Sequence, residues 1–335
     1  MNLPFIYLVC GLALGLQACS VKASKQEHIE RQNSQINQAT RREMQIISEQ
    51  FIRQLGKGDT TAAKKMMAQQ LVDNLDRFPA LSAAFARDFT GLLTLLEEVE
   101  VLSDGKEAVH NIQYDSELLG KYNFKYYIAN KQMYFAQYSF GNDQKQFLVL
   151  LGFGREDKDS QWKLFRFFYG PYSYYHKNAG SYFNMAQQYK HNKDTMQELL
   201  NAFAAQALLS PIGEALELAN QEIIYKHYQS AVNAFVQKYP TDYPFQLKEI
   251  PSKPMIYAFT FSPNEQSVRL KVSLVSKKFD DEAGLQKELE DITAVLKTKF
   301  PGITGGQTEV VYSVCDKDYV NNAGFRSKEM IIKVI

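Results

Sequence analysis

The side chains that most often bind metals or act as nucleophiles are few in this chain and widely scattered. None of the histidines forms a His-x-x-x-His or His-Glu pair at the spacing of metal ligands. We therefore expect them to be solvated or buried in a core, and we expect no metal site. The five histidines are His28, His110, His176, His191 and His227.

Short glycine-rich and acidic motifs do not complete a site either. Gly152-Phe153-Gly154 precedes a charged turn and a strand and not a helix, so the motif offers phosphate no helix N-terminus to bind. Asp157-Lys158-Asp159 and Asp316-Lys317-Asp318 begin like calcium loops but lack the central glycine and late glutamate of an EF-hand. Asp280-Asp281-Glu282 is explained by the cap and acidic first turn of a helix. With no nucleophile elbow and no P-loop, the sequence predicts a protein that is not an enzyme and needs no cofactor.

A cysteine stands where the apolar run at the start of the chain ends. Residues 1–18 carry no charged side chain, and Phe5–Leu16 are almost wholly apolar. This run is too short to span a bilayer, which needs about 20 apolar residues, but it has the length of a signal-peptide core. Leu16-Gln17-Ala18-Cys19 resembles the lipobox of bacterial lipoproteins. The resemblance implies that residues 1–18 are a signal peptide and that Cys19 becomes the lipidated N-terminus.

Lipidation at Cys19 would anchor the protein to the bacterial cell envelope, since two or three acyl chains make attachment stable. Ser20 is not the aspartate that retains enterobacterial lipoproteins at the inner membrane, so the resemblance favours the outer membrane. Val21–Arg42 is dominated by polar residues. We therefore expect residues 19–42 to form the anchor and a tether.

The remaining cysteines and the charge balance exclude two further classes. Cys10 lies in the predicted signal peptide, so Cys315 has no partner for a disulfide in the mature chain. Cys315 ends an apolar run typical of a strand, and we expect it to be buried. The 335 residues include 38 Lys plus Arg and 37 Asp plus Glu, a formal net charge of +1. Such a balance leaves no electrostatic footprint for nucleic acid.

Residues 43–175 are expected to form an α+β domain. Apolar residues at helical spacing predict three helices, one from Gln45, one from Asp59 to about Leu75, and one from Ala80 to about Leu96. From Ala108 the period changes to two, which predicts an antiparallel meander. Its strands are expected at about 108–115, 122–129, 133–140, 146–154 and 161–169. This order of elements resembles the NTF2-like cone fold, which implies helices packed on a curled antiparallel sheet, often around a pocket.

The rest of the chain predicts a helical connector over residues 176–245 and a small α+β domain over residues 246–335. Apolar stripes at helical spacing run through the connector, and proline-rich turns separate it from the domain. In the small domain we expect strands at 255–262, 267–275, 308–315 and 328–334, with a helix at 281–299.

Aromatic side chains crowd the stretch from Trp162 to Tyr175. Alternation along a strand would put Trp162 and Phe168 on one face and Phe165 and Phe167 on the other, so both faces would carry rings. The second face must then be covered by the helices that follow, by a partner or by an apolar ligand. The residues of this candidate binding surface are Trp162, Phe165, Phe168, Tyr172, Tyr174 and Tyr175.

The sequence thus predicts a lipid-anchored envelope protein that acts by binding, as a scaffold for a periplasmic or outer-membrane protein. The alternative is a protein that binds a small apolar or lipid-like ligand in a pocket of the first domain. Hydrolysis of a cell-wall or carbohydrate substrate is a third, weaker hypothesis, because no pair of carboxylates can be assigned to it from the sequence.

The lipid anchor can be tested at one residue. A Cys19→Ser variant should no longer incorporate labelled palmitate and should no longer sediment with membranes, because it lacks the thiol that carries the acyl chains. Cys315→Ser is the matched control and should behave as the unchanged chain. A Cys19→Ser protein that still labels and still sediments would overturn the anchor.

Overall fold

The computed structural model describes residues 28–73, 78–104, 108–116, 118–156, 160–239, 242–317 and 326–334. The described chain forms two compact units of α+β structure. Unit 1 runs to Tyr172 and includes Ser210–Leu218, and unit 2 comprises Ser173–Leu209 and the chain from Ala219 onward. In the described part, no helix is long and apolar enough to cross a membrane. Cys19, the predicted signal peptide and the turn 157–159 lie outside the described residues.

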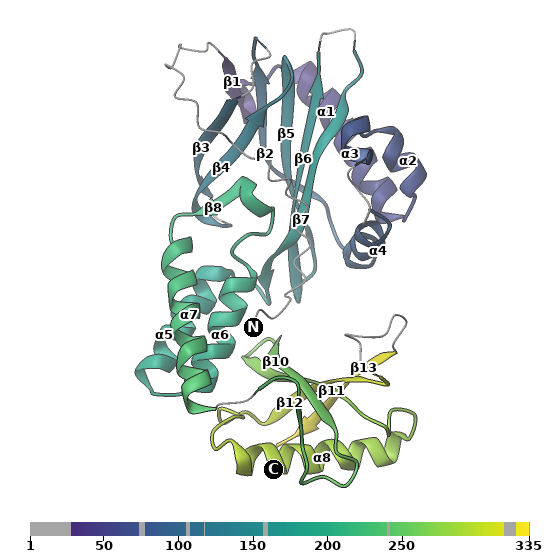
Figure 1. Ribbon diagram of the computed structural model, residues 1–335. Helices are drawn as coiled ribbons and strands as arrows, with labels where there is room; N and C mark the ends of the chain where they lie inside the picture. The colour runs from purple at the N-terminus through teal and green to yellow at the C-terminus, as the bar shows by residue number, and fades with distance from the viewer. Residues whose placement is uncertain are drawn as a thin grey trace. The chain divides into compact units, whose positions relative to one another are not determined.

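Unit 1 contains two sheets (Figure 1). The larger has the order β1-β2-β5-β6-β7 and the smaller the order β3-β4-β8. The larger sheet is made of β1 (Ile29–Gln32), β2 (Thr94–Leu102), β5 (Gln132–Gly141), β6 (Lys145–Arg155) and β7 (Lys163–Tyr174). The smaller is made of β3 (Ala108–Ser116), β4 (Gly120–Ile128) and β8 (Leu216–Leu218). The registered pairs of both sheets are antiparallel.

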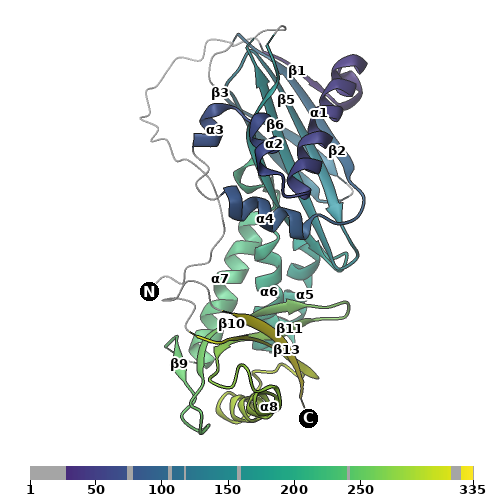
Figure 2. The ribbon, with the colours of Figure 1, turned by 90° about the vertical axis from the view of Figure 1, so that its right-hand side faces the viewer.

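Helices cover one face of the larger sheet (Figure 2). They are α1 (Gln38–Gly56), α2 (Thr60–Lys65), α3 (Gln69–Asp73) and α4 (Phe78–Asp88). The Asn37 side chain caps α1 by accepting from the Ala39 N–H at 2.8 Å, and Asp59 caps α2 by accepting from the Ala62 N–H at 2.9 Å. These caps satisfy backbone donors that a helix start leaves free.

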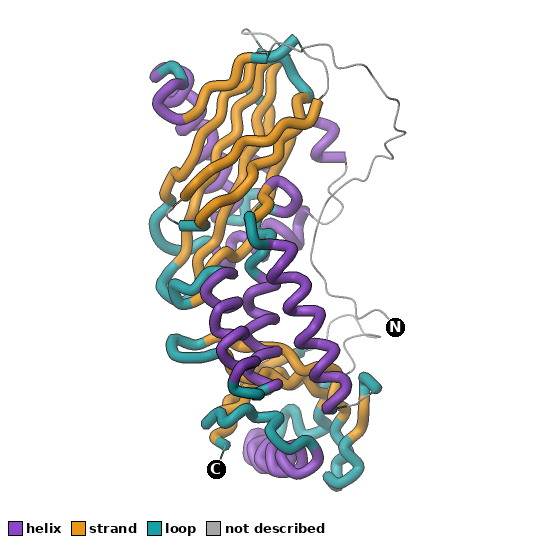
Figure 3. Tube along the Cα trace, turned by 90° about the vertical axis from the view of Figure 1, so that its left-hand side faces the viewer, coloured by secondary structure: helices purple, strands orange, loops and turns teal. Residues whose placement is uncertain are grey.

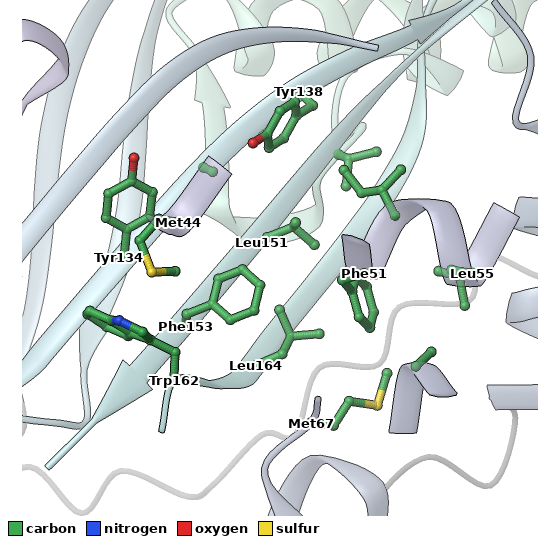
Figure 4. Packing of buried hydrophobic residues seen from close by; sticks show 14 of the residues in the cluster. Met44, Phe51, Leu55, Met67, Tyr134, Tyr138, Leu151, Phe153, Trp162 and Leu164 are labelled. Atoms are coloured by element: carbon green, nitrogen blue, oxygen red, sulfur yellow. The ribbon is translucent and has the colours of Figure 1, made fainter. Parts of the chain in front are cut away.

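The face under the helices is a closed apolar core (Figure 4). Met44, Phe51 and Leu55 of α1 are fully buried against alternate residues of the strands, among them Leu151 and Phe153 of β6. Alternation along a strand puts every second side chain on the same face, so these strand residues point at the helices together. Burial of such aromatic and aliphatic side chains is the main term that stabilises this layer.

The opposite face of the larger sheet is covered by the smaller sheet, which lies on the side of unit 1 seen in Figure 3. Phe135 of β5 connects the two layers. Its ring centroid lies 5.7 Å from that of Phe124 on β4 and 5.8 Å from that of Phe165 on β7. Gly152 of β6 makes room for this ring, since a Cβ there would lie 3.0 Å from the Phe135 ring. Unit 1 therefore has three layers, with helices, a large sheet and a small sheet.

Four predictions for unit 1 were wrong in detail. The helix predicted from Asp59 to about Leu75 is divided into two short helices, α2 and α3. The helix predicted from Ala80 to about Leu96 ends at Asp88, and β2 begins at Thr94. Leu92 and Leu93, which fit the helical spacing, lie in the turn before β2, and Leu96 lies in β2 itself. Leu92 is 86% exposed. The predicted single meander is also split, because β3 and β4 pair with each other and not with β5. A strand precedes the helices, since β1 pairs with β2.

The segment predicted to be a tether contributes to the fold. Residues Ile29–Gln32 form β1, and Ile36 is buried in the core under the helices. The polar composition of this segment hid the strand, because β1 is an edge strand that exposes part of each side chain.

Unit 2 contains three helices, a five-stranded sheet and a helix on that sheet. The helices are α5 (Ala179–His191), α6 (Thr195–Ala207) and α7 (Gln221–Lys238). The sheet order is β13-β12-β11-β10-β9. Its elements are β9 (Phe245–Gln246), β10 (Met255–Pro263), β11 (Val268–Val275), α8 (Glu282–Lys299), β12 (Glu309–Cys315) and β13 (Ser327–Lys333). The strands and the helix predicted for 255–334 are confirmed to within a few residues.

The neighbouring strands β11 and β12 of this sheet run parallel and are connected through α8. A parallel pair needs such a crossover, whereas the antiparallel neighbours can follow directly. Asp281 caps α8 by accepting from the Gly284 N–H at 3.0 Å, as the acidic triplet predicted. Inside the layer, the hydroxyls of Thr293 and Tyr312 lie 2.7 Å apart and tie α8 to β12.

A buried carboxylate fastens α1 to the larger sheet of unit 1. Glu98 of β2 is 1% exposed, and the Arg41 Nε donates to its Oε2 at 2.7 Å. The Tyr134 hydroxyl and the Gln45 amide donate to its Oε1. Both oxygens of Glu98 thus have partners, which a buried charge requires.

Arg41→Ala should lower the free energy of unfolding by about 2 kcal/mol, because it leaves the buried Glu98 carboxylate without its cation. Urea denaturation near neutral pH measures the change. The neighbouring Arg42 is exposed, so Arg42→Ala should change stability by less than about 0.5 kcal/mol. Equal effects of the two variants would contradict the role given to the ion pair.

Candidate functional site

The six residues of the predicted aromatic surface lie in three different surroundings. Trp162 is buried in the core under the helices, with the Arg155 guanidinium 4.2 Å from its ring. Phe165, Phe168 and Tyr172 line the face toward the smaller sheet, where Tyr172 donates to Gln146 Oε1 at 3.1 Å. Tyr174 and Tyr175 belong to unit 2. The structure therefore places three of the six, Phe165, Phe168 and Tyr172, on one face of the larger sheet.

The alternation predicted for this strand shifts by one residue inside β7. Leu164 and Phe167 both pack in the core under the helices, so two residues between them, Phe165 and Arg166, face the smaller sheet. One extra residue in a strand produces such a shift. Phe168 consequently lies with Phe165, and the guanidinium of Arg166 lies 5.5 Å from the Phe168 ring.

The face of β7 that carries Phe165 and Phe168 is covered by other parts of unit 1. Besides the smaller sheet, the segment Ser210–Leu218 packs here, and Gly213 lies against the Phe168 ring. Gly170 permits the close approach, since a Cβ at this position would lie 2.5 Å from the Pro211 carbonyl oxygen. Arg166 also pairs with Glu214 of this segment at 3.1 Å.

A polar cluster that the sequence did not single out lies between the two sheets. We call it the inter-sheet cluster, and its members come from β1 to β5 and the residues beside β1. They are His28, Glu30, Asn33, Glu97, His110, Tyr114, Tyr122, Tyr126 and Gln137. The alternation Tyr122, Phe124, Tyr126 along β4 was the available signal, since it aims these rings at one face.

One end of the inter-sheet cluster joins β4 to β5. The Tyr122 hydroxyl donates to Gln137 Oε1 at 3.2 Å, and the Tyr114 ring stacks on that of Tyr122 at 5.3 Å. Gln137 is 2% exposed, yet its Nε2 and the Tyr114 hydroxyl have no hydrogen-bond partner among the described residues. Buried polar groups normally find partners, so this end has donors available for a water molecule or another acceptor.

The other end joins β4 to β1. The Tyr126 hydroxyl donates to Glu30 Oε2 at 2.6 Å, and the Tyr126 ring stacks on that of His110. The His110 ring lies 4.0 Å from the ring of His28. Burial, and then the charge of His28, lower the pKa of His110, while Glu30 opposes the shift. The pair of histidines was not foreseen from its sequence spacing.

Burial raises the pKa of the Tyr114, Tyr122 and Tyr126 hydroxyls above the ordinary value, and the nearby carboxylates Glu97 and Glu30 add to the effect. These hydroxyls stay protonated at neutral pH, and those of Tyr122 and Tyr126 act as hydrogen-bond donors. A general base or an activated nucleophile would need the opposite shift. The cluster can therefore join two sheets or hold a polar group, but its hydroxyls are not set to accept protons.

The remaining candidates for chemistry have structural partners. Cys315 is buried, and burial raises the pKa of its thiol, which disfavours the reactive thiolate. Asp316 accepts from Arg326, which places it in a turn. His227 lies 3.5 Å from Glu198, between helices α6 and α7. In the described ranges, no group of three or more His, Cys, Asp or Glu residues could hold a metal ion.

Comparisons of this chain with protein families, with curated proteins and with solved structures found no match.

The Tyr122 hydroxyl should affect the free energy of unfolding in two ways, one at pH 8 and one above pH 10. Tyr122→Phe should lower the free energy of unfolding by about 1 kcal/mol at pH 8, because Gln137 loses its donor. Tyr225→Phe on α7, at a ring that is 46% exposed, should change it by less than about 0.5 kcal/mol.

Above pH 10 the raised pKa of Tyr122 acts on stability. The folded chain keeps a proton that the unfolded chain releases. The contribution to stability is therefore full below pH 10 and is lost as the pH rises from about 10 up to and through the raised folded pKa. Each such tyrosine contributes a slope of about 1.4 kcal/mol per pH unit. Tyr122→Phe should remove that contribution in urea denaturation between pH 10 and 11. An unchanged slope would show that the hydroxyl titrates normally.

Proposed function

We propose that this protein is a lipid-anchored, non-catalytic binding or scaffold module of the bacterial cell envelope, attached through Cys19, with the outer membrane as the favoured location. The lipobox-like residues before Cys19 support the anchor.

The single observation that carries the binding function is the aromatic face of β7. Phe165, Phe168 and Tyr172 share this face, and the residues Phe165 and Phe168 are partly exposed although unit 1 packs against them. Aromatic rings that keep some exposed surface are favoured anchors for a protein partner. The proposed partner is a periplasmic or outer-membrane protein that contacts Phe165 and Phe168.

For the fold of unit 1 we propose a variant of the NTF2-like cone. Helices on one face of an antiparallel sheet support this assignment. The separate β3-β4-β8 sheet on the other face is the departure from that plan. The pocket that the cone often encloses would lie under the helices, and here that space holds fully buried side chains such as Phe51 and Phe153. Ligand binding in such a pocket is therefore the second hypothesis.

The test is photo-crosslinking of the full-length chain in its membranes, with a benzoylphenylalanine in place of Phe168. A discrete product with one envelope protein is expected. Ile46 on α1 is 68% exposed and supplies the matched control position, which should not give the same product.

Native mass spectrometry of the detergent-released chain separates the two hypotheses. Partner binding predicts the mass of the lipidated chain alone after the partner is removed. An additional small-molecule mass that organic extraction removes would instead favour the pocket. Absence of any specific crosslink at Phe168 together with such a mass would overturn the scaffold proposal.

A further inference from the structure

We propose that β13 pairs with β13 of a second copy of this chain, so that two unit 2 sheets join across a two-fold axis. β13 is an outer strand of its sheet, and no described strand pairs with its other side. It is seven residues long, whereas β9 at the opposite edge has two. An edge strand of this length presents a row of backbone donors and acceptors to another chain.

Backbone hydrogen bonds at both ends of β13 identify the groups that face outward. The Asp316 N–H donates to the Arg326 carbonyl at 3.1 Å, and the Val334 N–H donates to the Thr308 carbonyl at 2.7 Å. Backbone groups alternate in direction along an antiparallel pair, so even-numbered residues of β13 bond to β12. The N–H and C=O groups of Glu329, Ile331 and Lys333 therefore point away from the sheet.

The side chains of these odd-numbered residues lie on one face of the sheet. Ile332, on the other face, is 2% exposed, whereas Ile331 is 52% exposed. Ile331 is flanked by exposed Glu329 and Lys333. An exposed isoleucine between two opposite charges, at the position where the backbone is free, is the feature that a partner strand must match.

The strand matches itself in one register. When β13 meets its copy antiparallel with Ile331 opposite Ile331, Glu329 faces Lys333 of the copy and Lys333 faces Glu329. On the other face, Met330 then faces Ile332. Opposite charges and apolar pairs directly across an antiparallel ladder stabilise it, and like charges destabilise it.

Two other symmetric registers of β13 are mismatched. Centring the pair on Met330 sets Glu329 against Ile331, and centring it on Glu329 sets two glutamates against each other. A two-fold axis perpendicular to the sheet keeps the odd-numbered residues of both copies on the same face. Pairings that set an odd-numbered residue opposite an even-numbered one are therefore excluded. Charged residues on an edge usually prevent association. In β13 they disfavour the register centred on Glu329 and favour the one centred on Ile331, where Glu329 meets Lys333 of the copy.

A disulfide can report this register in the full-length chain. In a Cys315→Ser background, Ile331→Cys should form a covalent dimer when membranes are treated with a mild oxidant. Opposed residues in such a pair lie about 5.5 Å apart at Cα, within disulfide range.

Ser327→Cys is the matched control for this experiment, since Ser327 is also exposed and on the same face. In the proposed register it lies eight positions from its copy, about 27 Å away. It should give at least about tenfold less dimer. Equal yields would indicate random collision and would overturn the proposal, as would no dimer from either variant.

A charge exchange tests the pairing independently. In the Ile331→Cys, Cys315→Ser chain, Glu329→Lys or Lys333→Glu alone sets like charges opposite each other twice, and each should lower the dimer yield about tenfold. The double variant Glu329→Lys, Lys333→Glu restores opposite charges and should recover the yield.

Effects within one copy would not recover in this way. Glu329 pairs with Lys271, and Lys333 lies opposite Glu309 in its own sheet, so the double variant disturbs both contacts. A double variant with a yield below either single variant would show that the charges act within one copy and would overturn the self-pairing. The test does not depend on the proposed binding function, because it detects only contacts between copies.

Discussion

The architecture of unit 1 follows from a sheet that carries apolar side chains on both faces. Phe153 and Leu151 of β6 point toward the helices, and Phe135 of β5 points the other way. Water cannot remain against either face without losing the free energy that burial supplies. Helices cover one face and a second sheet covers the other, so the three layers are the solution to one constraint.

This arrangement forces polar groups into the interior. The ion pair of Arg41 and Glu98 crosses from helix to sheet, and Tyr122 and Gln137 cross from sheet to sheet. Each contact satisfies groups that the layers would otherwise leave buried and unpaired. Such contacts also fix the position of one layer relative to the next, because a hydrogen bond is directional and an apolar contact is not.

Much of the fold could be predicted from the pattern of apolar residues. The predictions that failed all concern residues whose placement is decided by tertiary packing and not by local spacing. Strands 255–263 and 309–315 were recognisable because turns separate them from their neighbours. β2 was missed because Leu93 and Leu96 also fit a helix, and only the packed sheet decides between the two. The inter-sheet cluster could not be predicted, since Gln137 and Tyr122 meet only after two sheets stack. The aromatic density of β7 was visible, but a one-residue shift decided which rings share a face.

The path of the chain between the units has a consequence for how the protein can be divided. Unit 1 needs Ser210–Leu218, because β8 pairs with Tyr122–Phe124 of β4. The segments on both sides of this stretch belong to unit 2. No single cut separates two complete units, and a fragment that stops at Tyr172 lacks the strand that finishes the smaller sheet. During synthesis, unit 1 cannot be completed until α5 and α6 have been translated, because β8 follows them in the chain. The two units thus cannot be separated by one cut, and unit 1 cannot be completed before part of unit 2 has been synthesised.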